Sequence, residues 1–444
     1  MGKKRNNDDN YYRYVETNTT SDTKNKIDKR ILMNRIKAVI VLAIIAFSVW
    51  ALVNRIKNSA SSKSNIEYKQ NLNVEFLAKR NVSDFIEKME GTLEYDFQVD
   101  TTKLGEQDVV FNYLTPKNKR KTDTFKINVV DTVKPKVLGS TSITYFKDHE
   151  VDLNQNFFSG DLCDPNPKRE IVGNYDFKTV GDYNLVYRVT DKSNNVNNFS
   201  FTLHIINPSS TRRTSTTENA NANENDNTPT RKFKDDVQLY KNDNTKLGID
   251  VSYFQGNVDW AKVKEAGCDF AIIRVGYQKG FDKGIEEDSY FDNNIQGARA
   301  QGIDLGFYFY SYAKTTDEAK KQAKWTIEKI KNYGITKTEL PICFDWESWD
   351  KFSELGISLY DMNHMAQVFN TEVENAGFEG ALYSSTNYMN RVWLDEYVKN
   401  VWIASYVEKT NYMGKYYMWQ YSNKGRIDGV NGDVDLNILY INKY

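Results

Sequence analysis

Apolar and polar residues follow distinct patterns along the chain, and these patterns divide it into regions. Residues 1–35 are polar, charged and Asn-rich without apolar periodicity, which predicts a disordered tail. Residues 36–56 are almost continuously apolar. Short alternating runs fill 73–207, and strand-like segments alternate with helix-like segments over 245–444. With 444 residues, the chain is expected to form several domains.

The apolar segment 36–56 has about the length that a membrane-spanning helix requires. Its uninterrupted centre runs from Ala38 to Val53, and basic residues crowd its N-terminal side, which places that side in the cytoplasm. No polar stripe makes the segment amphipathic, so a buried soluble helix is disfavoured. We expect a transmembrane helix that anchors a single-pass protein in the cell membrane, followed by a stalk at 57–72.

A cleaved signal peptide is the alternative for this segment, with Ser59-Ala60 as the cleavage site. Two features disfavour cleavage. Arg55 and Lys57 directly follow the apolar run, and the region before it is long. We therefore expect the helix to be retained and the rest of the chain to be extracellular.

Residues 73–207 consist of short alternating runs punctuated by Asn, Asp and Gly, as in antiparallel β domains. They contain an internal repeat, because residues 103–131 align without gaps with residues 179–207. The repeat predicts two small all-β sandwich domains of immunoglobulin-like type in tandem, 73–131 and 132–207. The second copy, with VDTVKPKV and FKTVGDYNLVYRVTDKSNN, resembles bacterial immunoglobulin-like modules. Because neither copy concentrates chemical groups, we expect both to be spacers.

Residues 208–244 are rich in Ser, Thr and Asn, which predicts a flexible linker. Strand and helix patterns then alternate to the end of the chain. Thr315 and Glu318 form a capping box that opens one of the helices, and Gly334 ends it. About 200 residues of this alternation predict a C-terminal α/β barrel of TIM-like type, with function at the carboxyl ends of the strands.

Composition limits the chemistry that the chain can perform. The formal net charge of −1 gives no long-range attraction to nucleic acid. The three cysteines are scattered and read as buried thiols, and the three histidines have no ligand or triad neighbour at a recognisable spacing. We therefore expect no metal, no other cofactor and no nucleic-acid partner, and chemistry that depends on carboxylates.

Four carboxylates stand at predicted strand ends: Asp250 in GIDVS, Asp345 and Glu347 in FDWES, and Asp435 in GDVDLN. Residues i and i+2 of a strand share a face, and strand ends converge in a barrel, so these acids can share one pocket. Clustered acids raise one another's proton affinity, which keeps a Glu protonated as a general acid near neutral pH. Paired acids with aromatic walls suit cleavage of a glycosidic bond. For each acid taken singly, a solvated loop position is the alternative.

The same segments carry a family resemblance. LGIDVSYFQGNVDW, FDWES and MWQYSNKGRIDGVNGDVDLN resemble the signature segments of glycoside hydrolase family 25, the N-acetylmuramidases or lysozymes, and so do FAIIRVGY, LGFYFYSYA and ALYSS. The resemblance runs from about Lys246 to the C-terminus, in the family's order. One departure is Phe309, which stands where the family often has a His. The resemblance implies a flattened β/α barrel and cleavage of the β-1,4 bond between N-acetylmuramic acid and N-acetylglucosamine in peptidoglycan.

The resemblance also implies roles for particular residues. Glu347 resembles the family's proton donor, and Asp345, Asp250 and Asp435 match its remaining pocket acids. Several aromatic residues are expected to bind the substrate, with packing in the core as the alternative: Tyr308, Tyr310, Tyr383 and Trp419.

The sequence leaves the route of cleavage open. Asp345 and Glu347 lie about 6.5 Å apart at Cα on one strand, which is compatible with both retaining and inverting separations of the carboxyl groups. We favour a substrate-assisted route, in which the 2-acetamido group of the sugar is the nucleophile and Asp345 orients it.

We therefore expect a membrane-anchored muramidase that faces the cell wall, with the β domains and the linker as its stalk. A catalytically silent wall-binding module is one alternative, disfavoured because all four acids are present. A chitinase-type barrel is another, but the residues before Glu347 lack the D-x-x-D-x-D-x-E run it requires. Three roles stay open: remodelling of the producer's own wall, service to a secretion or DNA-transfer machine in the envelope, and attack on competitors. A membrane tether favours work on the producer's own wall.

Overall fold

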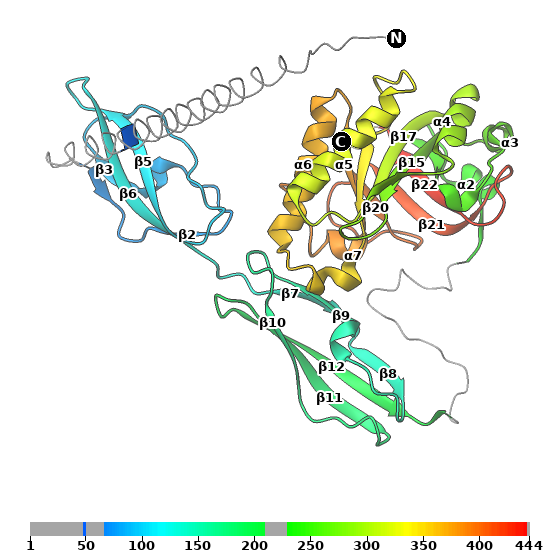
Figure 1. Ribbon diagram of the computed structural model, residues 1–444, viewed down its shortest axis with the longest axis horizontal. Coiled ribbons are helices and arrows are strands. Elements are labelled where there is room, and N and C mark those ends of the chain that lie inside the picture. Colours follow the sequence, from blue (N-terminus) through cyan, green and yellow to red (C-terminus); the bar gives the residue numbers. More distant parts are fainter. Residues whose placement is uncertain (1–47, 50–65, 209–228, 442–444) are drawn as a thin grey trace, which may run out of the picture. The chain divides into compact units, whose positions relative to one another are not determined.

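The computed structural model describes residues 48–49, 66–208 and 229–441. The chain divides into two compact units, Met1–Val130 and Asp131–Tyr444. Figure 1 shows the elements of both units, which are described one at a time below.

The prediction of a transmembrane helix at 36–56 stands corrected. Nearly all of that segment lies outside the described residues, which include only Ser48 and Val49 of it. Among the described residues, no helix is long and apolar enough to cross a membrane. The longest of these helices, α5 (Thr316–Lys331) and α6 (Leu359–Asn375), bury one face and expose the other. The fold class with a membrane helix and the single-pass location in the cell membrane are corrected with it.

The first unit is built from short strands. A four-stranded sheet has the order β2-β6-β5-β4, and a two-stranded sheet pairs β1 with β3. Alternate residues of β5 and β6 are buried, because side chains of a strand point to opposite faces in turn. The elements are β1 (Ile66–Tyr68), β2 (Asn73–Glu75), η1 (Val82–Phe85), β3 (Ile86–Met89), β4 (Thr92–Leu93), β5 (Gly105–Leu114) and β6 (Arg120–Val130).

The first part of the second unit, residues 131–207, repeats this arrangement and is called the second β module below. Its four-stranded sheet has the order β10-β11-β12-β8, and β7 pairs with β9. The long hairpin β5–β6 thus recurs as β11–β12, as the sequence repeat predicts. The elements are β7 (Lys136–Gly139), β8 (Ser142–Phe146), η2 (Leu153–Asn156), β9 (Phe157–Gly160), β10 (Lys168–Val172), β11 (Gly181–Thr190) and β12 (Val196–Ile206).

The predicted immunoglobulin-like fold of the two β regions is not supported. In each region the described strands form one four-stranded sheet and one two-stranded sheet, whereas an immunoglobulin domain has about seven strands in two larger sheets. The short alternating runs indicated strands correctly, but such runs do not determine how many strands each sheet receives.

The second β module packs against the rest of its unit through β9. Phe157 of this strand stacks on Tyr187 inside the module at 4.5 Å between ring centroids, whereas its neighbour Phe158 points to the other face. Phe158 is 1% exposed and lies 5.1 Å from Phe352 and 5.8 Å from Trp349, measured between ring centroids. Both belong to η5 (Trp349–Glu354). The module therefore shares a hydrophobic core with the C-terminal domain.

The C-terminal domain is a closed α/β barrel, as predicted, with one strand reversed. Neighbouring strands run parallel from β14 to β21, and β22 closes the barrel by pairing antiparallel with both β21 and β14. The barrel strands are β14 (Thr245–Val251), β15 (Phe270–Gln278), β17 (Asp304–Ser311), β18 (Ile342–Trp346), β19 (Gly380–Ser385), β20 (Val401–Ala404), β21 (Met418–Arg426) and β22 (Val434–Tyr440).

Helices lie outside this barrel (Figure 1). Half of the predicted capping box of α5 forms, since the Thr315 side chain accepts a hydrogen bond from the Glu318 backbone N–H. The Glu318 side chain accepts its hydrogen bond from the Lys314 backbone N–H at 2.7 Å instead of from that of Thr315. Gly334 follows the helix at a φ of +71°, a conformation that favours glycine. The remaining short elements are η4 (Tyr253–Gln255), α3 (Trp260–Glu265), β16 (Ile285–Glu287), α4 (Phe291–Ala300) and α7 (Thr386–Met389).

The barrel domain begins earlier than the sequence indicated. Within the predicted linker 208–244, β13 (Arg231–Lys232) pairs with β21, and α2 (Phe233–Tyr240) follows it. Phe233 is fully buried, and Asp236 accepts a hydrogen bond of 3.1 Å from the Tyr421 hydroxyl. Residues 229–244 therefore belong to the barrel domain.

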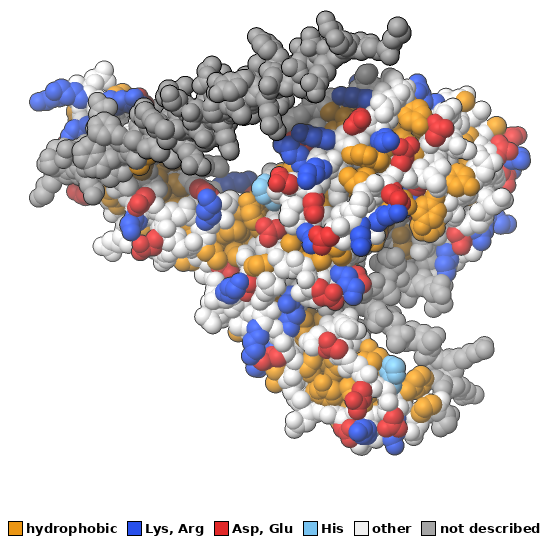
Figure 2. All heavy atoms as spheres, in the orientation of Figure 1, with side chains coloured by type: hydrophobic (Ala, Val, Ile, Leu, Met, Phe, Trp, Pro, Cys, Tyr) orange, Lys and Arg blue, Asp and Glu red, His pale blue; other side chains and the backbone are white. Residues whose placement is uncertain are grey.

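Acidic and basic side chains are interspersed on the face of the described residues that Figure 2 shows. This mixture agrees with the formal net charge of −1.

Candidate active site

The four predicted acids line a single cavity of about 180 Å³. Asp250 and Asp345 lie near the carboxyl ends of the parallel strands β14 and β18, and Glu347 follows β18 directly. Asp435 enters from β22, whose antiparallel direction places its first residues at the same rim, opposite Asp250 in register. The barrel thus brings together acids that are far apart in the sequence.

Asp250 and Asp435 form a hydrogen-bonded pair of acids. Asp250 Oδ2 accepts hydrogen bonds from Gln420 Nε2 at 2.9 Å and from Asn437 Nδ2 at 2.8 Å. Burial raises the pKa of Asp250, and these amide donors oppose the rise because they favour the ionised form. The pKa of Asp435 lies well above its usual value because of burial and the adjacent Asp250 charge. Two buried acids in contact oppose each other's ionisation, so the pair favours a state in which it holds a proton.

Asp345 is the most enclosed acid of the set, at 5% exposed. Its Oδ1 is buried and has no hydrogen-bond partner among the described residues. Burial raises its pKa well above the usual range, and the charges of Glu347 and Asp250 add to the rise, while Arg274 opposes it. An acid in this state has one oxygen available for a ligand that enters the cavity.

Glu347 lies partly exposed in the same cavity. Burial raises its pKa to about 7, and the charge of Asp250 contributes. Trp346, the residue between the two acids, points the other way: it is fully buried and donates a 3.0 Å hydrogen bond to the Ala313 carbonyl. The strand alternation thus fixes Asp345 and Glu347 on the cavity side.

Arg274 on β15 is the cation among the residues that line this cavity, and the sequence analysis missed it. Its guanidinium pairs with the buried Asp288 at 2.7 Å. The ring of Tyr253 lies 4.7 Å from the guanidinium carbon and that of Tyr277 lies 5.0 Å from it, both within cation–π range. A charge held in this way offsets part of the repulsion among the four acids.

Two amide side chains connect the acids to the aromatic wall. Gln420, whose Nε2 binds Asp250, accepts hydrogen bonds at Oε1 from the hydroxyls of Tyr383 at 2.9 Å and Tyr406 at 2.8 Å. Asn437 accepts a 2.8 Å hydrogen bond from Trp402 Nε1. Sequence reasoning missed this network, although a Gln and an Asn on otherwise apolar strands are a signal for a polar interior site.

The predicted aromatic residues separate into two groups. Tyr308, Tyr310 and Tyr383 line the cavity. Trp419 does not: its neighbour Gln420 faces the cavity, so Trp419 faces outward, where it donates a hydrogen bond of 2.8 Å to the Ser405 carbonyl. Trp402 is the indole that lines the cavity.

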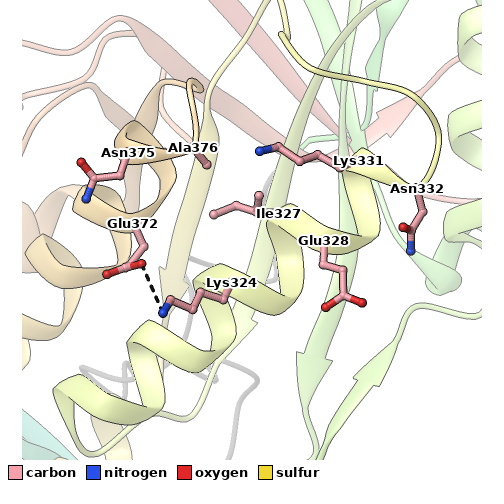
Figure 3. A pocket seen from close by; sticks show the side chains of 8 residues that line it. All are labelled: Lys324, Ile327, Glu328, Lys331, Asn332, Glu372, Asn375 and Ala376. Atoms are coloured by element: carbon pink, nitrogen blue, oxygen red, sulfur yellow. Dashed lines mark ion pairs between the residues drawn. The ribbon is translucent and has the colours of Figure 1, made fainter.

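Another depression, of about 470 Å³, lies on the outside of the barrel between α5 and α6. Figure 3 shows its lining, in which Lys324 forms an ion pair with Glu372 at 3.9 Å. None of the four predicted acids lines it. The cavity at the strand ends is therefore the candidate active site.

Residues 249–430 match the sequence model of the glycosyl hydrolases family 25. This stretch is therefore similar to the domain of that family. This stretch includes Asp250, Asp345 and Glu347, and Asp435 follows it closely. By its description, the family consists of glycosyl hydrolases.

Known relatives match the same part of the chain. The Autolytic lysozyme of Clostridium acetobutylicum is 29% identical over 193 residues, which are 43% of this chain and 54% of that protein. Lysozyme M1 of Streptomyces globisporus is 26% identical over 200 residues, which are 43% of this chain and 66% of that protein. The chain thus spans about half the length of the Clostridium relative.

Among solved structures, the modular autolysin LytC from Streptococcus pneumoniae in complex with a synthetic peptidoglycan ligand aligns with a TM-score of 0.40. It is 22% identical, and the alignment covers 57% of this chain and 56% of that one. A family 25 glycosyl hydrolase from Bacillus anthracis aligns with a TM-score of 0.38 at 22% identity, over 46% of this chain and 93% of that one.

Proposed function

We propose that this protein is a peptidoglycan hydrolase, an N-acetylmuramidase that cleaves the β-1,4 bond between N-acetylmuramic acid and N-acetylglucosamine. The family 25 domain and its lysozyme relatives support the substrate class. The observation that carries the proposal is the environment of Glu347. This side chain lies with three further acids in one cavity, and its pKa is raised to about 7. A carboxyl group of this kind holds a proton at neutral pH and can give it to a leaving oxygen.

Glu347 is the general acid in this proposal. Its proton passes to the glycosidic oxygen as the bond to the anomeric carbon breaks, so the leaving sugar departs as a neutral alcohol. Glu347 is then ionised and takes a proton from the water that attacks the anomeric carbon in the second step. The partial exposure of Glu347 gives that water access.

Asp345 is the orienting acid. The 2-acetamido oxygen of the bound sugar attacks the anomeric carbon, and Asp345 Oδ1, which lacks a protein partner, accepts a hydrogen bond from the acetamido N–H. The charge of Glu347 contributes to the raised pKa of Asp345. The hydrogen bond from the acetamido N–H favours the ionised form of Asp345, so the transferable proton stays on Glu347. A covalent sugar ester on Asp345, detected by mass spectrometry, would contradict this route.

The remaining cavity residues stabilise charge and hold the sugar. Asp250 is fixed by Gln420 and Asn437, so its carboxylate faces the positive charge that develops on the sugar ring. Tyr308 and Tyr310 line the cavity and provide surfaces for the sugar.

The direct test is the release of reducing sugar from purified peptidoglycan. Glu347→Gln removes the transferable proton and is expected to lower the rate about 10²- to 10⁴-fold. Glu354→Gln, at an exposed position later in the same loop, is the matched control and should keep the wild-type rate. If the wild-type chain binds peptidoglycan without releasing reducing sugar, the chain is a wall-binding module and the proposal fails.

A further inference from the structure

A second group of acids lies in the second β module, away from the four acids of the cavity. Asp131 and Asp161 each offer a carboxylate oxygen and Cys163 offers its Sγ, and these atoms lie within 4.8 Å of one another. Asp161 is 1% exposed and Asp131 is 7% exposed. Cys163 is partly exposed and forms no disulfide. Two buried carboxylates and a thiol at this spacing are a possible set of metal ligands.

Asp161 supplies the observation that points to a ligand. Its Oδ1 accepts hydrogen bonds from the backbone N–H groups of Cys163 at 2.9 Å and Asp164 at 2.8 Å. Its Oδ2 is equally buried but has no hydrogen-bond partner among the described residues. Burial raises the pKa of Asp161 to about 6, and the charges of Asp131 and Asp191 contribute to the rise. A buried oxygen without a partner is costly, and a bound cation removes that cost.

The neighbouring acids have structural partners of their own. Asp191 accepts hydrogen bonds from the backbone and the side chain of Asn195 at 2.8 and 2.9 Å. Asp164 accepts hydrogen bonds from the backbone of Asn166 and Lys192, both at 3.0 Å, and pairs with the Lys192 ammonium at 3.1 Å. The ammonium group of Lys192 thus lies against Asp164. The buried oxygen that has no hydrogen-bond partner among the described residues is Oδ2 of Asp161.

We propose that Asp131, Asp161 and Cys163 bind a divalent cation of the zinc class. Zinc accepts carboxylate oxygen together with thiolate sulfur, and three protein ligands plus one water complete its four positions. Calcium instead requires six to eight oxygen ligands, which a set containing a thiol does not favour. Cys163 releases its proton on binding, so affinity should rise with pH.

The position of this site gives the cation a structural role. The Asp161 carbonyl accepts a 2.8 Å hydrogen bond from the Leu359 backbone, and the Leu162 carbonyl accepts one of 3.2 Å from the Tyr360 backbone. Leu359 and Tyr360 begin helix α6 of the barrel. The cation would therefore tie Asp131 to the loop after β9, whose carbonyl groups accept hydrogen bonds from the start of α6. This inference does not depend on the proposed muramidase activity.

The test uses the full chain after treatment with a chelator and its removal. Titration with Zn²⁺ alone, followed by calorimetry and by thermal unfolding, should show one bound ion per chain and a higher Tm. Asp161→Asn keeps an oxygen for the two backbone hydrogen bonds, so it should fold while its affinity for Zn²⁺ falls at least tenfold. Cys163→Ser should show a similar loss. Asp176→Asn, the same change at an exposed site of the module, should bind as the wild type does.

Three outcomes would overturn the site. They are the absence of Zn²⁺ binding by the wild-type chain, undiminished binding by Asp161→Asn, and a site that binds Ca²⁺ in preference to Zn²⁺ with no dependence on Cys163. Circular dichroism of each variant in the presence of chelator verifies that a variant that no longer binds Zn²⁺ is still folded.

Discussion

At the scale of single residues, the protonation of Glu347 governs the proposed activity. Because the acid form is the active one and the pKa is about 7, kcat/KM on peptidoglycan fragments should fall as pH rises through about 7. Asp250→Asn removes a negative charge that contributes to the raised pKa, so the residual activity of this variant should decline at a lower pH. A pH profile measured for both proteins tests this shift. If kcat/KM of Asp250→Asn falls at the same pH as that of the wild type, the charge of Asp250 does not raise the pKa of Glu347.

The same raised pKa links Glu347 to stability. Its pKa rises from 4.5 to about 7 on folding. The contribution of Glu347 to the free energy of unfolding is therefore fully present below about pH 4.5 and is lost as the pH rises through about 7. Glu347→Gln cannot ionise and avoids that loss. The variant should therefore gain stability relative to the wild type between pH 5 and pH 8, by at most about 3 kcal/mol. Urea unfolding at both pH values measures this, and an equal difference at both would contradict the link.

The sequence predicted the four acids because each stands at the end of a strand-like run and the barrel brings strand ends together. It missed Arg274, Gln420 and Asn437, which lie within strands where a polar residue reads as a minor exception to an apolar pattern. Trp419 was expected to bind the substrate, but strand direction decides between neighbours, and Gln420 takes the cavity side. Such facing is set by the closed barrel, so an isolated segment does not reveal it.

At the scale of elements, β9 and η5 connect the second β module to the active site. Phe158 packs against Trp349, whose backbone N–H donates a 2.8 Å hydrogen bond to the carbonyl of Glu347. Phe158→Ala should cost about 3–5 kcal/mol through the cavity it leaves, and it should lower kcat because the loop after Glu347 loosens. Urea unfolding and reducing-sugar release measure the two effects.

The control for Phe158→Ala is Phe177→Ala, which opens a cavity inside the module near Tyr145 and Tyr175 rather than at the barrel. It should destabilise the module and leave kcat unchanged. Equal kcat values for the two variants would show that the contact of β9 with η5 does not position Glu347.

Gly160 tests the same contact from the opposite direction. A Cβ at this position would lie 2.7 Å from a ring carbon of Phe352 and 2.9 Å from a methyl carbon of Leu359, so only glycine allows the approach. Gly160→Ala should destabilise the chain by about 1–3 kcal/mol, as overpacking does. Thermal unfolding measures this change in stability. An unchanged Tm would mean that the module and the barrel separate at little cost in free energy.

From the sequence, the second β module was expected to be a spacer. In the structure, Phe158 of this module packs in the hydrophobic core of the barrel domain. A signal for this was present in Phe157 and Phe158: two adjacent large apolar residues in an alternating strand have both faces to bury. What the second face packs against is a long-range contact, which periodicity does not identify.

At the scale of the whole molecule, the repeat and the α/β barrel followed from sequence patterns, whereas domain limits did not. Residues 229–244 looked like a linker because two turns of helix and a two-residue strand are too short to give a periodic signal. The apolar segment 36–56 matched the length of a membrane span, yet no helix among the described residues meets that requirement.

The shared core predicts how truncations behave. A fragment of residues 131–444 keeps Phe158 against the barrel and should unfold in one cooperative transition. A fragment of residues 229–444 exposes the faces of Trp349 and Phe352 that Phe158 covers, and it should have a lower Tm and a tendency to associate. Calorimetry and size-exclusion chromatography compare the two, and equal Tm values would contradict the shared core.

Mass spectrometry of the muropeptides that the full chain releases from purified peptidoglycan tests the central claim most directly. The chain should release disaccharide products that carry N-acetylmuramic acid at the new reducing end, and Glu347→Gln should release them about 10²- to 10⁴-fold more slowly. Products that end in reducing N-acetylglucosamine, or peptides without a new reducing end, would contradict the assignment of Glu347 and its neighbouring acids to a muramidase site.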